Sequence, residues 1–239
     1  MAIMKLKTGI SGLDQVFKGG IRENSSVLIS GGPGTGKTIF AMQFLVEGAK
    51  TGQPGLCILY GSEKEGFLEY ADSIGVEVRK YVKSGAIFIL EQPFLTRKFM
   101  SIAAALELIH TKKIKRVVID SLTMFAYVHV QTERDYRKEI VNFLSNMTKV
   151  TLVATAEGSE SNIDGDELKP EYFLFDGILF LNRVRRAASF ERVLFIGKMR
   201  GQDHLMEIFP FLIGEGGIRV YPDQLPFSLM GMEAKKRLS

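Results

Sequence analysis

Residues 31–38 read GGPGTGKT and fit the phosphate-loop pattern GxxxxGK[ST] at every position. The apolar run 26–30 before the loop predicts a buried strand, and residues 39–49 after it carry apolar side chains at the density of a helix. A strand, a loop and a helix in this order are the context in which the pattern binds phosphate, whereas a chance glycine-rich turn requires neither flank. The sequence therefore predicts a site for a nucleoside triphosphate.

The residue types of the loop explain how it would hold the nucleotide. Glycines let the backbone close around a polyphosphate, so that successive N–H groups and the positive end of the following helix point at the anion. We expect Lys37 to reach the β- and γ-phosphates, and the Thr38 hydroxyl to ligate Mg²⁺. The residues predicted to bind the nucleotide are Gly32, Pro33, Gly34, Thr35, Gly36, Lys37, Thr38 and Ile39.

A second part of the site is predicted at Asp120, where the apolar strand-like run 116–119 ends in a carboxylate. In an open parallel sheet, ligands lie beyond the carboxyl ends of the strands. We therefore expect Asp120 to bind, through water, the Mg²⁺ that accompanies the nucleotide. An Asp after an apolar run is a weak signal alone, and it gains weight from the phosphate loop that precedes it.

The periodicity of apolar residues predicts an α/β fold with a mostly parallel sheet flanked by helices. Ser11 is expected to cap a short helix whose Leu13 faces the core. From residue 177 several strands follow one another without a helix between them, which predicts antiparallel hairpins at one edge. The expected strands are 26–30, 56–60, 86–90, 116–120, 150–156, 177–184, 191–198, 206–212 and 218–221, and the longer helices are 39–49, about eight residues ending at 74, 96–110 and 132–147.

Length and composition limit the classes of protein. We expect residues 1–239 to form one domain, with a mobile acidic loop at 158–169 and a C-terminal tail at 223–239. The chain has neither a long apolar run nor a leader-like N-terminus, so we expect it in the cytoplasm, with no membrane partner. The net charge is +4, with basic clusters at 112–116, 183–186 and 235–237. We interpret these clusters as solvated faces, with an anionic partner as the alternative.

Several segments resemble the KaiC-type branch of the RecA superfamily of ATPases. They are TGISGLD at 8–14 with GGI at 19–21, the phosphate loop, the strand 117–121, KMRG at 198–201 with His204, FPF at 209–211 and GGI at 216–218. The opening segment combined with KMRG is the most specific part, because general phosphate-loop proteins lack it. The resemblance covers nearly the whole chain, and it implies a RecA-like core, hexameric rings, ATP bound between subunits, and slow hydrolysis or phosphotransfer.

The same resemblance implies that a neighbouring subunit completes the site. In KaiC-like rings a Lys and an Arg reach the γ-phosphate of the ATP held by the adjacent subunit, and the matching residues here are Lys198 and Arg200. The residues that match those near the nucleoside are Met199, Gln202 and His204. The alternative is a solvated edge strand whose cations pair with nearby acids.

Two departures from the family pattern affect the expected chemistry. The family carries adjacent glutamates after the second strand, one of which activates the attacking water, but residues 62–65 read SEKE and are about two residues short. We take Glu63 as the candidate catalytic base and Glu65 as the second choice, with a solvated glutamate at a helix start as the alternative. The Ser-Thr phosphate acceptors of the clock proteins are replaced by Tyr172 and Phe173, so we do not expect a clock-type cycle of Ser/Thr autophosphorylation.

Three functions remain compatible with the sequence. The favoured one is Mg²⁺-dependent hydrolysis of ATP to ADP by a homo-oligomer, a hexamer by resemblance, that regulates an unidentified protein partner. A DNA-handling recombinase or helicase-type ATPase is the second; the pI near 9.0 favours it, but the acidic loop at 158–169 opposes it, since phosphate backbones are held by cations. A nucleotide-binding regulator with little hydrolysis is the third, which the irregular glutamate segment allows.

Overall fold

The structure, a computed structural model, describes residues 3–92, 102–129, 133–158, 169–186 and 188–228. The loop expected at 158–169 and most of the tail expected at 223–239 therefore lie outside the described residues. The same holds for the first part of the helix predicted at 96–110. Among the described residues, no helix has the length and apolar character needed to cross a membrane.

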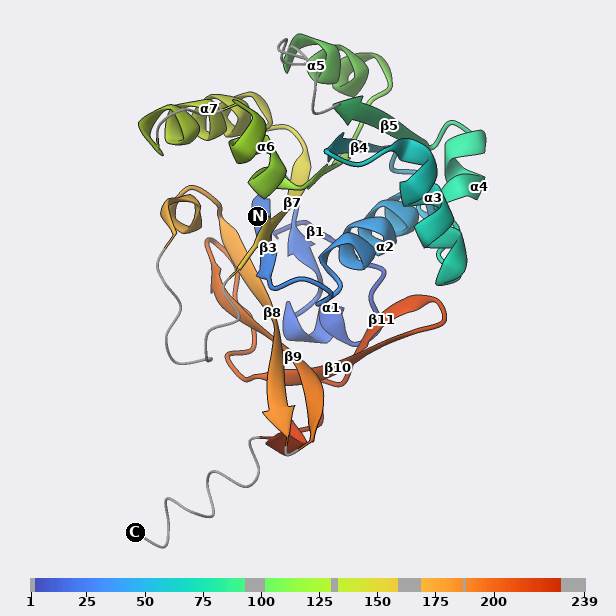
Figure 1. The fold of residues 1–239 in the computed structure, drawn as a ribbon. Coiled ribbons are helices and arrows are strands. Elements are labelled where there is room, and N and C mark those ends of the chain that lie inside the picture. Colours follow the sequence, from blue (N-terminus) through green and yellow to red (C-terminus); the bar gives the residue numbers. More distant parts are fainter. Residues whose placement is uncertain (1–2, 93–101, 130–132, 159–168, 187, 229–239) are drawn as a thin grey trace, which may run out of the picture.

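A nine-stranded sheet forms the centre of the molecule, in the order β11-β10-β9-β8-β3-β7-β6-β4-β5 (Figure 1). The strands from β8 to β5 in this order are parallel, and β9, β10 and β11 are added antiparallel at the other edge. This confirms the predicted α/β class with its antiparallel C-terminal strands. The strands are β3 (Ser26–Gly31), β4 (Gly55–Tyr60), β5 (Ile87–Gln92), β6 (Arg116–Asp120), β7 (Thr151–Glu157), β8 (Gly177–Arg186), β9 (Ser189–Met199), β10 (Phe209–Gly214) and β11 (Gly217–Val220), with a separate antiparallel pair of β1 (Lys5–Leu6) and β2 (Ile21–Arg22).

Helices cover both faces of the sheet, and each face has its own core. In β3, Val27 and Ile29 pack on the face that carries α1 to α4, while Leu28 packs on the face that carries α5 to α7. Strands buried on both faces read as continuous apolar runs, which is why they were predictable. The helices are α1 (Leu13–Val16), α2 (Lys37–Lys50), α3 (Lys64–Ser73), α4 (Val78–Lys83), α5 (Ile102–Thr111), α6 (Leu122–His129) and α7 (Glu133–Asn146), with a short 3₁₀ helix η1 (Pro170–Phe173).

Some local predictions were wrong. Ser11 does not cap α1, because its carbonyl accepts a hydrogen bond from Val220 and the helix starts after Gly12, which has φ 81°. Met206 is 81% exposed and precedes β10, which begins at Phe209. The short helices α4 and α6 and the pair β1–β2 were not predicted, because elements of two to eight residues contain too few periods to be recognised.

Arg116 is a buried residue, which corrects its interpretation as part of a solvated basic cluster. Its side chain is 1% exposed, and its guanidinium donates to the carbonyls of Lys7 and Phe44 and to Oε1 of Gln53 at 2.7–2.9 Å. Burial lowers the pKa of Arg116 to about 10, so the group stays charged at neutral pH. This cation ties the N-terminal segment, α2 and β6 together.

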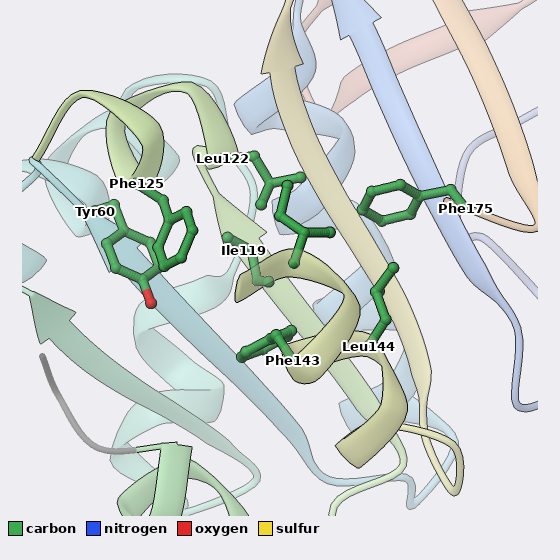
Figure 2. A pocket seen from close by; sticks show the side chains of 8 residues that line it. Tyr60, Ile119, Leu122, Phe125, Phe143, Leu144 and Phe175 are labelled. Atoms are coloured by element: carbon green, nitrogen blue, oxygen red, sulfur yellow. The ribbon is translucent and has the colours of Figure 1, made fainter. Parts of the chain in front are cut away.

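An apolar cavity lies between the sheet and the helices α6 and α7 (Figure 2). Tyr60 and Phe125 meet edge to face there, with ring centroids 5.4 Å apart, and burial raises the pKa of Tyr60 to about 12. The volume is about 10 Å³, about the room of one water molecule, and the lining offers such a water almost no polar surface. We therefore assign it to core packing and not to ligand binding. Its lining residues are Tyr60, Ile119, Leu122, Phe125, Ile140, Phe143, Leu144 and Phe175.

Replacing Arg116 tests its structural role. Arg116→Met should lower the free energy of unfolding by about 1–3 kcal/mol, because the buried carbonyl of Phe44 and the partly buried acceptors on Lys7 and Gln53 lose their donor. Urea unfolding followed by circular dichroism measures this change. The exposed neighbour serves as control, and Lys115→Met should change stability by less than about 0.5 kcal/mol. Equal effects of the two substitutions would contradict the assignment.

Candidate functional site

The phosphate loop joins the carboxyl end of β3 to the start of α2, as predicted from its flanks. Gly34 and Gly36 have φ angles of 72° and 104°, a conformation that glycine adopts without strain. The Thr35 hydroxyl donates to the carbonyl of Gly32 at 2.8 Å and fixes the bend. A side chain at Gly34 would meet nothing within 4 Å, so the backbone of the loop stays accessible to a ligand.

Lys37 is folded back over its own loop. Its Nζ donates to the carbonyls of Gly31 and Gly32 at 2.8 and 2.9 Å. Burial lowers the pKa of the Lys37 ammonium below its ordinary value, while the carboxylates of Glu157 and Asp120 oppose this shift. The site thus combines one cation that has lost part of its hydration with two carboxylates near it.

Asp120 is held at the carboxyl end of β6 by a hydroxyl from the neighbouring strand. The Thr155 Oγ1 donates to Oδ1 of Asp120 at 2.5 Å, and no described residue donates a hydrogen bond to the other carboxylate oxygen. A hydroxyl in this position fixes the orientation of the carboxylate. Sequence reasoning placed Asp120 correctly at the end of its strand but did not find Thr155.

Glu157 is a second residue that sequence reasoning missed as part of the site. It pairs in register with Gly31, because β7 lies between β3 and β6 in the sheet. Its backbone N–H donates to the Thr123 hydroxyl at 2.7 Å, and its carbonyl accepts from the Lys169 ammonium. A strand that ends in a carboxylate was one signal for it, but only the strand order brings that end beside the phosphate loop.

The hairpin of β10 and β11 packs against the far side of the phosphate loop. A side chain at Gly36 would meet Ile213 at 2.9 Å. The buried side-chain amide of Gln43 on α2 binds the hairpin through both its oxygen and its nitrogen. The oxygen accepts from the N–H of Ile218, and the nitrogen donates to the carbonyls of Gly216 and Ile218. These hydrogen bonds fasten the hairpin to the helix that follows the loop.

The two candidate bases are in different environments. Glu63 is exposed, has an extended backbone, and stands immediately before α3 without a side-chain capping bond. Glu65 forms an ion pair with Arg79 at 2.7 Å, and this hydrogen bond holds the pKa of Glu65 below its ordinary value. Arg79 also binds Asp72, so Glu65 belongs to an ion-pair network on α3 and α4. Within the described part of the chain, the carboxylate of Glu63 forms no ion pair.

Lys198 and Arg200 lie away from the phosphate loop of their own chain. Lys198 pairs with Ile178, which in turn pairs with Leu28, three residues before the end of β3 at Gly31. That separation is roughly 10 Å along the strand direction. Both cations donate to backbone carbonyls of η1, Lys198 to Tyr172 at 2.5 Å and Arg200 to Phe173 at 3.2 Å.

The remaining predicted residues of this segment differ in their accessibility. Met199 is 7% exposed and packs in the core. The Gln202 amide donates to the carbonyls of Phe17 and Gly20 and accepts from the N–H of Arg22, so both of its ends are used within the chain. His204 is half-buried, and its Nδ1 contacts the carbonyl of Leu205 at 2.9 Å.

The residues at the loop fit a nucleotide and Mg²⁺ by the chemistry of their donors. The loop carries backbone N–H groups and an ammonium of the kind that bind phosphate, and Thr38 in the first turn of α2 and Asp120 carry oxygen groups of the kind that hold Mg²⁺ directly or through water. The described residues contain no cluster of three or more His, Cys, Asp or Glu side chains that would hold a metal ion alone. A magnesium ion here would depend on phosphate and water for its other ligands.

Comparison with known proteins identifies the family. A family model described as "ATPase: KaiC" matches residues 6–225. A protein of Thermotoga maritima described as a UPF0273 protein is 30% identical, and the alignment covers 93% of this chain and 98% of that protein. The circadian clock oscillator protein KaiC of Prochlorococcus marinus subsp. pastoris is 31% identical over 92% of this chain, which spans only 46% of that longer protein.

A solved structure agrees with the sequence relatives. The KaiC-like protein of the hyperthermophilic archaeon Pyrococcus horikoshii superposes with a TM-score of 0.80 at 31% identity, covering 92% of this chain and 100% of that one. The chain therefore belongs to the KaiC family of ATPases.

Proposed function

We propose that this chain hydrolyses ATP to ADP with the help of Mg²⁺, at sites shared between the subunits of a ring, and that the ring regulates a protein partner. The observation that carries the proposal is the phosphate loop, where Lys37 lies with Asp120 and Glu157 at the carboxyl edge of the sheet. Membership of the KaiC family supports an ATPase with this loop. The hexameric state follows from the resemblance.

The residues of the chain have distinct parts in this reaction. The loop N–H groups and Lys37 would bind the phosphates and neutralise charge that develops on them. Magnesium, when bound, would supply a further positive charge between the phosphates. Thr38 and Asp120 would hold the ion, with Asp120 oriented by the Thr155 hydroxyl. Tyr172, at the position of a clock phosphate acceptor, is buried with its hydroxyl 3.0 Å from the Ser30 hydroxyl, which suits a packing role.

The central claim is tested at Lys37. Lys37→Ala should weaken binding of a fluorescent ATP analogue by at least about tenfold, because the charge that pairs with the β- and γ-phosphates is lost. Lys64→Ala, which removes a cation from α3, is the matched control and should leave binding unchanged. Unchanged nucleotide affinity in Lys37→Ala would refute the assignment of the site.

Glu63 is the proposed base that positions and activates the attacking water. Its carboxylate follows β4, and β4 lies beside β6, the strand of Asp120. Glu65 is the less suitable candidate because its ion pair with Arg79 must break before it can turn toward the loop. The position of the base matters more here than the pKa of its carboxyl group, since the base must hold the water in line with the γ-phosphate.

The choice between these glutamates can be decided by two substitutions. Glu63→Gln should leave nucleotide binding intact and lower steady-state ATP hydrolysis by roughly 10²-fold, because the amide cannot accept the proton. Glu65→Gln is the matched control, and it should retain most of the hydrolysis while losing the ion pair with Arg79. A loss in Glu65→Gln alone would identify Glu65, two residues further along, as the base.

Lys198 and Arg200 are the cations that we propose to act on the neighbouring subunit. Their distance from their own phosphate loop along the sheet supports a role in trans over a role in cis. Met199 and Gln202, which are engaged inside the chain, would keep this segment in place, and His204 would lie near the neighbour's nucleoside. A cation supplied across an interface makes hydrolysis depend on assembly, as arginine fingers do.

Mixing of inactive subunits tests the shared site. Lys37→Ala and Arg200→Ala should each be inactive alone. In an equal mixture, about a quarter of the interfaces pair an intact loop with an intact arginine, so the mixture should regain up to about a quarter of the ATP turnover. ATP turnover measured after mixing reports the rescue. The control is a mixture of Lys37→Ala with Asp120→Asn. Both substitutions lie in the half of the site that holds the phosphate loop, so every interface has a defective loop half and activity should not return. If neither mixture recovers, the trans role of Arg200 is wrong.

A further inference from the structure

The strands β8 and β9 form a ribbon that runs past the parallel part of the sheet (Figure 1). Leu181 of β8 is level with Gly31, the last residue of β3, and β8 continues beyond this point to Arg186. β9 pairs with β8 along this whole extension. Among the described residues, β10 pairs with β9 only at Val193 and Leu194, so the end of the ribbon has no further strand beside it.

One face of this ribbon changes from apolar to cationic along its length. Directly paired residues share a face, and the pair Leu181–Leu194 lies in the core on the side of α2. The next two pairs on the same face contain three arginines and one aromatic residue, and none of the four is acidic. We call these residues the cationic face: Arg183, Arg185, Phe190 and Arg192.

The side chains of the cationic face are accessible to a partner. Arg183 and Arg185 are exposed, and Phe190 is 68% exposed, which is unusual for an aromatic ring. The Arg183 guanidinium lies 5.8 Å from the centre of the Phe190 ring. The Nε of Arg192 is a buried donor for which the described residues provide no acceptor. An anionic group at this face would meet the exposed charges of Arg183 and Arg185.

The register of the ribbon brings two of the arginines together. Arg183 stands directly opposite Arg192, and like charges in opposed positions destabilise a pair of strands. An anionic partner would reduce such repulsion when it binds. The exposed ring of Phe190, opposite Arg185, offers a flat apolar surface in the middle of the charge.

We propose that the cationic face binds single-stranded nucleic acid. The arginines would contact phosphates, and Phe190 would stack on a base, which is how proteins hold single strands without reading their sequence. The carboxylates of an acidic peptide would pair with the arginines, but they offer no nucleobase to stack on the exposed ring of Phe190. The four residues are not among those assigned to the nucleotide site, so this inference does not depend on the proposed ATPase mechanism.

Binding of a fluorescent oligothymidylate to the full chain, measured by anisotropy over a series of salt concentrations, tests the proposal. The double variant Arg183→Gln/Arg185→Gln should bind at least about tenfold more weakly, and the slope of log K against log salt should fall by about 1.4, since each phosphate contact contributes about 0.7. The matched control is Lys112→Gln/Lys113→Gln, which removes the same charge from another exposed cluster. Its affinity and slope should stay close to those of the unchanged protein.

A second variant separates base stacking from charge. Phe190→Ala should lower the affinity by roughly tenfold with no change in the salt slope, because it removes a stacking surface and no cation. Polyglutamate, a polyanion without bases, should compete weakly. The proposal is overturned if the unchanged protein does not bind the oligonucleotide, or if the arginine variant binds like its control. It is also overturned if polyglutamate competes equally and Phe190→Ala has no effect. Unfolding midpoints equal to that of the unchanged protein exclude misfolding as the cause.

Discussion

The parallel pairing of β3 between β7 and β8 is the constraint on which the rest of the structure depends. Because β3 is buried on both faces and between two neighbours, its carboxyl end at Gly31 is fixed, and the phosphate loop starts from a rigid point. The loop itself has few contacts of its own on the ligand side, as the open space at Gly34 shows. Its shape therefore comes from β3 before it and α2 after it.

Two groups of interactions extend this constraint to the site. On one side, β7 places Thr155 and Glu157 between the phosphate loop and Asp120, so the carboxylates and Lys37 share one electrostatic environment. On the other side, Gln43 fastens the C-terminal hairpin to α2 through a buried amide. A chain segment that is distant in sequence thus supports the loop, as expected when the strands that flank the site come from different parts of the chain.

The antiparallel half of the sheet differs from the parallel half in what it exposes. Parallel strands are covered on both faces by α1 to α7, and their side chains form the two cores. β8 begins inside these cores and leaves them at the level of the phosphate loop, and the antiparallel β9 runs back into them; beyond that level, arginines replace leucines on the same face. Side chains on one face of the β8–β9 ribbon therefore form part of the core at one end of the ribbon and an accessible charged face at the other.

The sequence by itself determined the phosphate loop, the α/β class, the position of Asp120 at the end of a strand, and most of the longer elements, because each of these is a local pattern of residue types. It did not determine the strand order, and so it could not show that Glu157 and Thr155 lie beside Lys37 and Asp120. It also misjudged Arg116, since a cation in a basic cluster looks solvated until the carbonyls that surround it are known. Only the tertiary structure decides these points, because they depend on contacts between residues far apart in the chain, which no local pattern of residue types records.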